Sequence, residues 1–118
     1  MTFDDKSPIF LQIKKWIEEQ ILQGILKEED QIPSTTQIVQ FYKINHITVS
    51  KGINLLVDEG IIYKKRGVGM FVCPGAMELL KNLRRSEFTK NFVKPMVKEA
   101  KNLNIENENL LEIVKENL

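Results

Sequence analysis

The chain has 118 residues, of which 42% are hydrophobic and 28% are charged, and its net charge is +1. This length allows one small domain, or one domain with a short appendage, around a real hydrophobic core. No run of the sequence approaches the roughly 20 apolar residues that a membrane-spanning helix needs. The first residues also lack the basic and apolar stretches of an export signal, so we expect a cytoplasmic protein with no membrane partner.

The residue types that build most catalytic and metal sites are scarce. The chain has one histidine and one cysteine, which excludes the usual zinc spacings and argues against Ser/His or Cys/His catalysis. Gly67-Val68-Gly69 is not a Walker-type loop, because neither Lys-Ser/Thr nor a helix follows it. We therefore expect no enzyme, no metal and no cofactor. Cys73 is expected to be a small buried hydrophobe rather than a thiol sensor.

The charges are unevenly distributed along the chain. Residues 1–42 hold four basic and seven acidic residues, whereas residues 43–75 hold five basic and two acidic residues. A basic segment in a nearly neutral protein favours an anionic partner for that segment, although a solvated face has the same composition.

The first helix is predicted to begin at Ser7 and Pro8 and to end at Gly24. Serine is a good N-cap, proline is favoured at the first helical position, and glycine supplies a left-handed C-terminal residue. Four isoleucines and Trp16 recur at three- and four-residue intervals between them, which predicts one buried face.

Two further helices joined by a short turn are predicted between residues 34 and 60. Ser34 is expected to cap a helix over residues 35–42, and Asn45 to cap a helix over residues 46–59 that Gly60 closes. In the first of these helices we expect the inward-facing residues to be Ile38, Val39, Phe41 and Tyr42. In the second, the expected buried stripe is Val49, Ile53, Leu56 and Val57, with His46, Ile47, Ser50, Lys51 and Asn54 around the other side.

A β-hairpin is predicted next. Residues 61–65 and 70–73 are β-prone, and the four residues between them include two glycines that allow the positive φ angles of a tight turn. Pro74 and Gly75 end the hairpin and mark the expected boundary between a first domain (1–75) and a second part (76–118).

This order is that of a winged helix-turn-helix, in which one helix enters the DNA major groove and the hairpin approaches the neighbouring backbone. The fold is therefore expected to be mainly α with a small β-hairpin and a short C-terminal helical segment for dimerisation. The residues expected to contact DNA are Ser34, Thr35 and Thr36; Asn45, His46, Thr48, Ser50 and Lys51; and Lys64, Lys65, Arg66, Gly67, Val68 and Gly69.

The C-terminal part is predicted to be helical, with a kink or break near residues 91–94 caused by Pro95, a turn at residues 103–106 and a last amphipathic helix. Its apolar stripes need a partner, because about 43 residues cannot enclose much of a core. A second copy of the chain is the expected partner. The residues expected at that interface are Leu79, Leu80, Leu83, Phe88, Phe92 and Met96.

The same residues resemble the GntR family of bacterial transcription regulators, and specifically its small YtrA-like subfamily. The resemblance lies in Pro8–Ile13, Gly24–Leu26, Gln31–Ser34, Thr48–Lys51, Glu59–Ile62 and Arg66–Val72, with a further match at Glu99–Ile105. It implies a dimeric repressor without the large effector domain of other members, and it carries roles in DNA binding directly to Thr48, Lys51, Gly67 and Gly69.

The chain also departs from the family pattern. The family usually has Glu-Arg after Pro-Ser, with the arginine touching DNA, where this chain has Thr35-Thr36. This difference implies another operator preference. The position after Lys51 is often alanine in the family, and Gly52 is expected to cost up to about 1 kcal/mol in a helix interior.

We expect a repressor that binds an inverted repeat in double-stranded DNA as a homodimer, with half-sites about one helical turn apart. The alternative from another class is a winged-helix adaptor that binds a partner protein and has no sequence-specific DNA binding. A third possibility is a ligand-sensing regulator whose pocket is lined by Phe88, Phe92 and Met96. The operator, the regulated genes and any small-molecule effector do not follow from the sequence.

Overall fold

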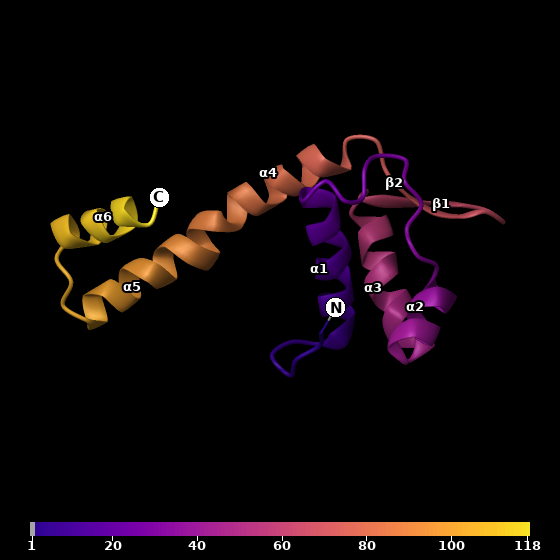
Figure 1. The fold of residues 1–118 in the computed structure, drawn as a ribbon, viewed down its shortest axis with the longest axis horizontal. Helices are drawn as coiled ribbons and strands as arrows, with labels where there is room; N and C mark the ends of the chain where they lie inside the picture. The colour runs from indigo at the N-terminus through magenta and orange to yellow at the C-terminus, as the bar shows by residue number, and fades with distance from the viewer. Residues whose placement is uncertain (1) are drawn as a thin grey trace. The chain divides into compact units, whose positions relative to one another are not determined.

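The computed structural model describes residues 2–118, which form helices and one antiparallel hairpin (Figure 1). The elements are α1 (Ile9–Leu22), α2 (Thr35–Tyr42), α3 (His46–Asp58), β1 (Ile62–Lys65), β2 (Gly69–Val72), α4 (Ala76–Phe88), the π-helix η1 (Thr89–Val93), α5 (Lys94–Asn102) and α6 (Asn107–Glu116). The predicted fold class, mainly α with a small hairpin, is confirmed. None of these helices is long and apolar enough to cross a bilayer.

The chain divides into two compact units, one ending at Lys81 and the other comprising Asn82–Leu118. The dividing point lies within α4, later than the predicted boundary at residue 75. The reason is that the first turns of α4 belong to the core of the N-terminal unit, where Ala76 and Leu80 are buried.

The N-terminal unit is built around α3, which packs against α1 and α2 and contacts β1 (Figure 1). Its core is mostly isoleucine, valine and leucine from these elements. The predicted stripe of α3 is confirmed for Val49, Ile53 and Leu56, while Val57 is half-buried. This packing fixes which face of α3 points outward.

The start of α1 differs from the prediction. Pro8, not Ser7, is the N-cap, and no side chain caps the helix. The side chain of Gln12 instead ties the preceding residues to the helix, because it donates to the backbone carbonyls of Asp4 (2.8 Å) and Ser7 (2.8 Å). At the other end Gly24 has a φ of +79°, as predicted.

The helix α2 has the predicted bounds, but one of its expected core residues is exposed. Ile38 is buried, whereas Phe41 is 79% exposed and rests edge-on against Tyr42. With about 3.6 residues per turn, Ile38, Val39 and Tyr42 share the inward face of α2, and Phe41 lies beyond the edge of that face.

The hairpin pairs Ile62 with Val72 and Lys65 with Gly69. The segment before α2 runs along β2 as well: Glu29 and Ile32 donate backbone hydrogen bonds to Val72 and Met70, and Gln31 forms an isolated bridge with Phe71. The hairpin is thus fastened on its second side to the N-terminal helices.

In the C-terminal unit, the helical path around Pro95 widens into the π-helix η1. A break or kink was predicted there. Pro95 has no N–H that could donate to the carbonyl group four residues earlier. The π-helical turn η1 lies directly before α5 and accommodates this missing hydrogen bond. The turn predicted at residues 103–106 separates α5 from α6, as expected.

Candidate nucleic-acid interface

The first candidate segment is the start of α2. Ser34 forms a capping box with Gln37: its hydroxyl accepts from the Gln37 N–H (3.0 Å), and its own N–H donates to Oε1 of Gln37 (2.8 Å). Thr35 is half-buried and Thr36 is exposed. The box holds the first turn of α2 in place, and it leaves the Ser34 hydroxyl proton and the Thr36 side chain for an outside acceptor.

The second segment is the start of α3. Oδ1 of Asn45 accepts from the Ile47 N–H at 2.7 Å, so Asn45 is the predicted N-cap. The cap uses the carbonyl oxygen of this amide and leaves its NH₂ group free to donate. The first turn of α3 contains no acidic residue that would repel a phosphate.

The exposed face of α3 forms a shallow hollow that unites several predicted residues. It is lined by His46, Ile47, Ser50, Lys51, Asn54, Leu55 and Asp58. Oγ of Ser50 lies 3.4 Å from Nδ1 of His46, a long contact that leaves both groups able to bind elsewhere. Thr48 is half-buried and does not line this hollow.

Lys51 is held over the ring of Phe10 in α1, with Nζ 4.1 Å from the ring centroid. Lys51 is nevertheless exposed, and the attraction between its ammonium group and the aromatic face orients the side chain. The next residue, Gly52, lets α1 approach closely: a Cβ atom there would lie 2.6 Å from the Phe10 carbonyl oxygen. Gly52 therefore weakens α3 through its low helix propensity, as expected, but it also permits the close packing of α1 against α3.

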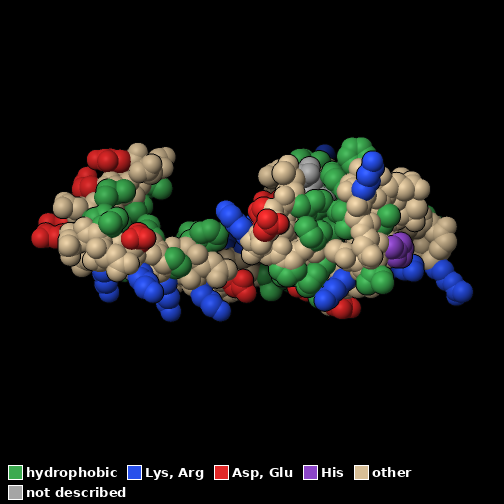
Figure 2. Space-filling view, turned by 90° about the horizontal axis from the view of Figure 1, so that it is seen from below, with side chains coloured by type: hydrophobic (Ala, Val, Ile, Leu, Met, Phe, Trp, Pro, Cys, Tyr) green, Lys and Arg blue, Asp and Glu red, His purple; other side chains and the backbone are tan. Residues whose placement is uncertain are grey.

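The hairpin tip is the third segment. Lys64, Lys65, Arg66, Gly67 and Val68 are exposed, and Gly69 is half-buried. Gly67 and Gly69 have φ values of +76° and +147°, as two glycines in the turn predicted. The Gln31 amide donates to the Val68 carbonyl at 3.1 Å and ties the tip to the strand-like segment before α2. Figure 2 shows basic side chains and the histidine together at the surface of the N-terminal unit.

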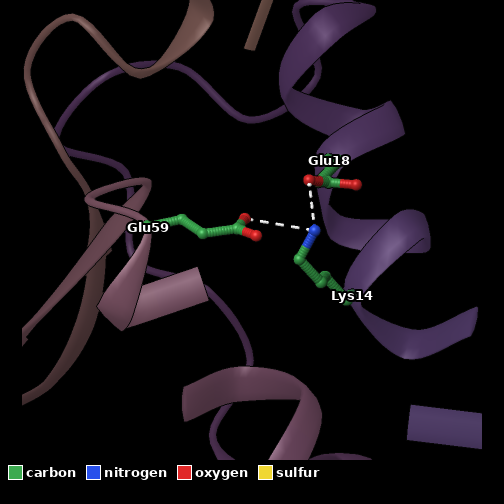
Figure 3. Close-up of polar contacts among 3 residues, drawn as sticks. All are labelled: Lys14, Glu18 and Glu59. Atoms are coloured by element: carbon green, nitrogen blue, oxygen red, sulfur yellow. Dashed lines mark hydrogen bonds and ion pairs between the residues drawn. The ribbon is translucent and has the colours of Figure 1, made fainter. Parts of the chain in front are cut away.

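An ion-pair bridge connects α1 with the C-terminal end of α3. Nζ of Lys14 in α1 lies 3.0 Å from Oε2 of Glu18 and 3.1 Å from Oε2 of Glu59, the C-cap of α3 (Figure 3). Burial alone would lower the pKa of Lys14, but the hydrogen bonds to both glutamates outweigh it and raise that pKa. The bridge joins α1 to the end of α3.

Cys73 is half-buried against the core, in keeping with the packing role expected of it. Burial, and after it the charge of Glu29, raises the pKa of its thiol. A raised pKa disfavours the thiolate form that a sensor needs.

Sequence reasoning missed several residues of this surface. Ile47 was placed on the exposed side of α3 but not among the contact residues, and Phe10, Gln31 and Gln37 were not connected with the site. Ser34 followed three residues later by glutamine is a capping-box signature that identifies Gln37. Phe10 and Gln31 act across long sequence separations, which no local pattern shows.

The expected dimer residues divide into two groups. Leu80 is only 1% exposed and belongs to the core of the N-terminal unit, so its assignment to a dimer interface is wrong. The others are exposed: Leu79, Leu83, Phe88, Phe92 and Met96. The rings of Phe88 and Phe92 lie 5.8 Å apart and present one apolar surface.

Comparison with known proteins agrees with this geometry. Residues 10–72 match the model of the gntR family of bacterial regulatory proteins. The HTH-type transcriptional repressor YtrA of Bacillus subtilis is 33% identical over 110 residues, which cover 93% of this chain and 84% of that protein. Two other curated relatives, the histidine utilization repressor of Klebsiella aerogenes and the HTH-type transcriptional repressor NagR of Bacillus subtilis, are longer, and the chain spans less than a third of their length.

Two solved structures are informative. A GntR-family regulator from Bacteroides thetaiotaomicron is 34% identical with a TM-score of 0.72, and the match covers 92% of this chain and 94% of that one. AraR(DBD) in complex with an operator is 28% identical with a TM-score of 0.56, over 62% of this chain and 93% of that one. The predicted resemblance is confirmed: the chain belongs to the gntR family of bacterial regulatory proteins and has a winged helix-turn-helix fold. Its similarity to the repressor YtrA extends over most of both chains.

Proposed function

We propose that this protein is a sequence-specific DNA-binding repressor that binds an inverted-repeat operator as a homodimer in the cytoplasm. The observation that carries the proposal is the exposed face of α3, where His46, Ser50 and Lys51 share one hollow on a winged helix. The likeness to AraR(DBD), which is bound to an operator, supports the same use of this fold. Family membership also supports a regulatory rather than an enzymatic role.

In this arrangement α3 enters the major groove. Residues at its start meet base edges or phosphates, and residues 34–36 at the start of α2 lie near flanking phosphates. The basic hairpin tip, residues 64–69, follows the backbone or the minor groove.

The test begins with selection of preferred sequences from random duplex DNA by the purified full chain. An enriched inverted repeat is the expected result, with affinity that falls as salt rises because bound lysines and arginines release counterions from DNA. If the chain shows neither a sequence preference nor salt-dependent binding to DNA, the result would instead favour the alternative function, a winged-helix adaptor that binds a partner protein.

Lys51→Ala then tests the α3 face. If Lys51 contacts a base, operator affinity should fall by about 1 to 3 kcal/mol, with a smaller loss on random DNA. If Lys51 contacts phosphate alone, both DNAs should lose affinity equally, with a shallower salt slope. Lys27→Ala, at an exposed lysine outside the three segments, is the matched control. Unchanged affinity of Lys51→Ala for both DNAs would remove Lys51 from the interface.

A further inference from the structure

Ile47 occupies an unusual place for an apolar residue. It is the second residue of α3, and its side chain is 75% exposed. Single exposed apolar residues are common on protein surfaces, so exposure alone says little. What distinguishes Ile47 is its surroundings, because it lines the same hollow as His46, Ser50 and Lys51.

The local structure also fixes the direction of this side chain. The Ile47 N–H is held by the Asn45 cap, which sets the first turn of α3. A β-branched side chain in a helix is largely confined to one χ1 rotamer. Ile47 therefore presents its methyl groups from a stiff support, at little entropic cost on binding.

The chemistry of the major groove leaves one match for such a group. Hydrogen-bond donors and acceptors cannot be read by an aliphatic side chain, whereas the C5-methyl group of thymine is an apolar feature of the groove edge. Resting on the proposed function of α3, we propose that Ile47 is a specificity-determining residue that recognises a thymine methyl group in each half-site. Its polar neighbours His46, Ser50 and Lys51 bind the adjacent base edges or phosphates.

The experiment uses the full chain and the duplex that it selects from random DNA. Each thymine of a half-site is replaced in turn by deoxyuridine, which removes the methyl group and keeps the hydrogen-bonding edge. We expect one position at which this replacement weakens wild-type binding about four-fold, the value for one methyl group leaving an apolar contact. Ile47→Ala should bind the thymine duplex more weakly and show no further loss at that position.

This non-additivity is the signature of direct contact between the two groups. Ile47→Val, which retains a branched apolar end, should keep most of the sensitivity to deoxyuridine. Ile25→Ala is the matched control, since Ile25 is a 63% exposed isoleucine outside the three segments, and it should keep the full four-fold loss. Circular dichroism checks that each variant is folded.

Two results would overturn the proposal in different ways. If the wild type tolerates deoxyuridine at every position, or if Ile47→Ala remains as sensitive as the wild type, Ile47 does not read a thymine methyl although the chain is still an operator-binding protein. If no sequence is enriched at all, the proposed function itself fails and the role of Ile47 fails with it.

Discussion

At the scale of single residues, Gly52 controls how closely α1 approaches α3. We predict that Gly52→Ala destabilises the fold by about 1 to 3 kcal/mol, because the added Cβ would lie 2.6 Å from a backbone oxygen of α1. Alanine is the better helix former by about 1 kcal/mol, so propensity alone predicts the opposite sign. Urea unfolding monitored by circular dichroism measures the difference.

Asn54→Ala is the control for Gly52→Ala, since Asn54 is exposed on the same helix and its replacement should raise the unfolding midpoint slightly through helix propensity alone. A higher midpoint for Gly52→Ala would show that the helices separate without cost, and the close approach would then not explain the glycine.

At the scale of elements, the bridge of Lys14 with Glu18 and Glu59 links α1 to the end of α3. The pKa of Lys14 is raised in the folded state, so the bridge stabilises fully below the lysine pKa of the unfolded chain and is lost as pH rises through the folded-state value. We predict that Lys14→Met lowers the melting temperature at about pH 8 and that this deficit shrinks as the pH rises above the ordinary lysine pKa of about 10.4.

The control for this pH dependence is Lys81→Met, because Lys81 pairs with Glu78 through a longer and more exposed contact of 3.8 Å within one helix. Its melting temperature should differ little from that of the wild type at either pH. A Lys14→Met deficit that is constant from neutral to alkaline pH would mean that the loss comes from packing of the lysine stem and not from its charge.

At the scale of the whole molecule, the exposed apolar residues of the C-terminal unit require a partner, and a second copy is the partner we propose. Phe92 is 66% exposed, so Phe92→Ser should leave the chain folded. We predict that it shifts the protein toward monomer at micromolar concentration and weakens operator binding, because two reading helices then no longer act together. Sedimentation velocity measures the shift.

Phe41→Ser, at a 79% exposed phenylalanine of the N-terminal unit, is the matched control and should sediment like the wild type. A Phe92→Ser protein that stays dimeric would place the interface elsewhere, and a wild type that is monomeric at every concentration would contradict the homodimer itself.

Much of the fold was predictable because its determinants are local. The capping residues Ser34 and Asn45, the hairpin glycines Gly67 and Gly69 and the buried stripe of α3 each act within a few residues, so pattern and chemistry identify them. These signals, in their order along the chain, were enough to predict the winged helix and the segments of the candidate interface.

Only the tertiary structure decided which side chains the packing leaves available. Leu80 and Phe41 carry the same kind of helical pattern as their neighbours, yet one is buried and the other exposed, because burial depends on what the fold places opposite. The contacts of Phe10 with Lys51 and of Gln31 with Val68 likewise join residues far apart in sequence. The sequence by itself determined the elements and their order, and three-dimensional packing determined which of their faces remain free to bind.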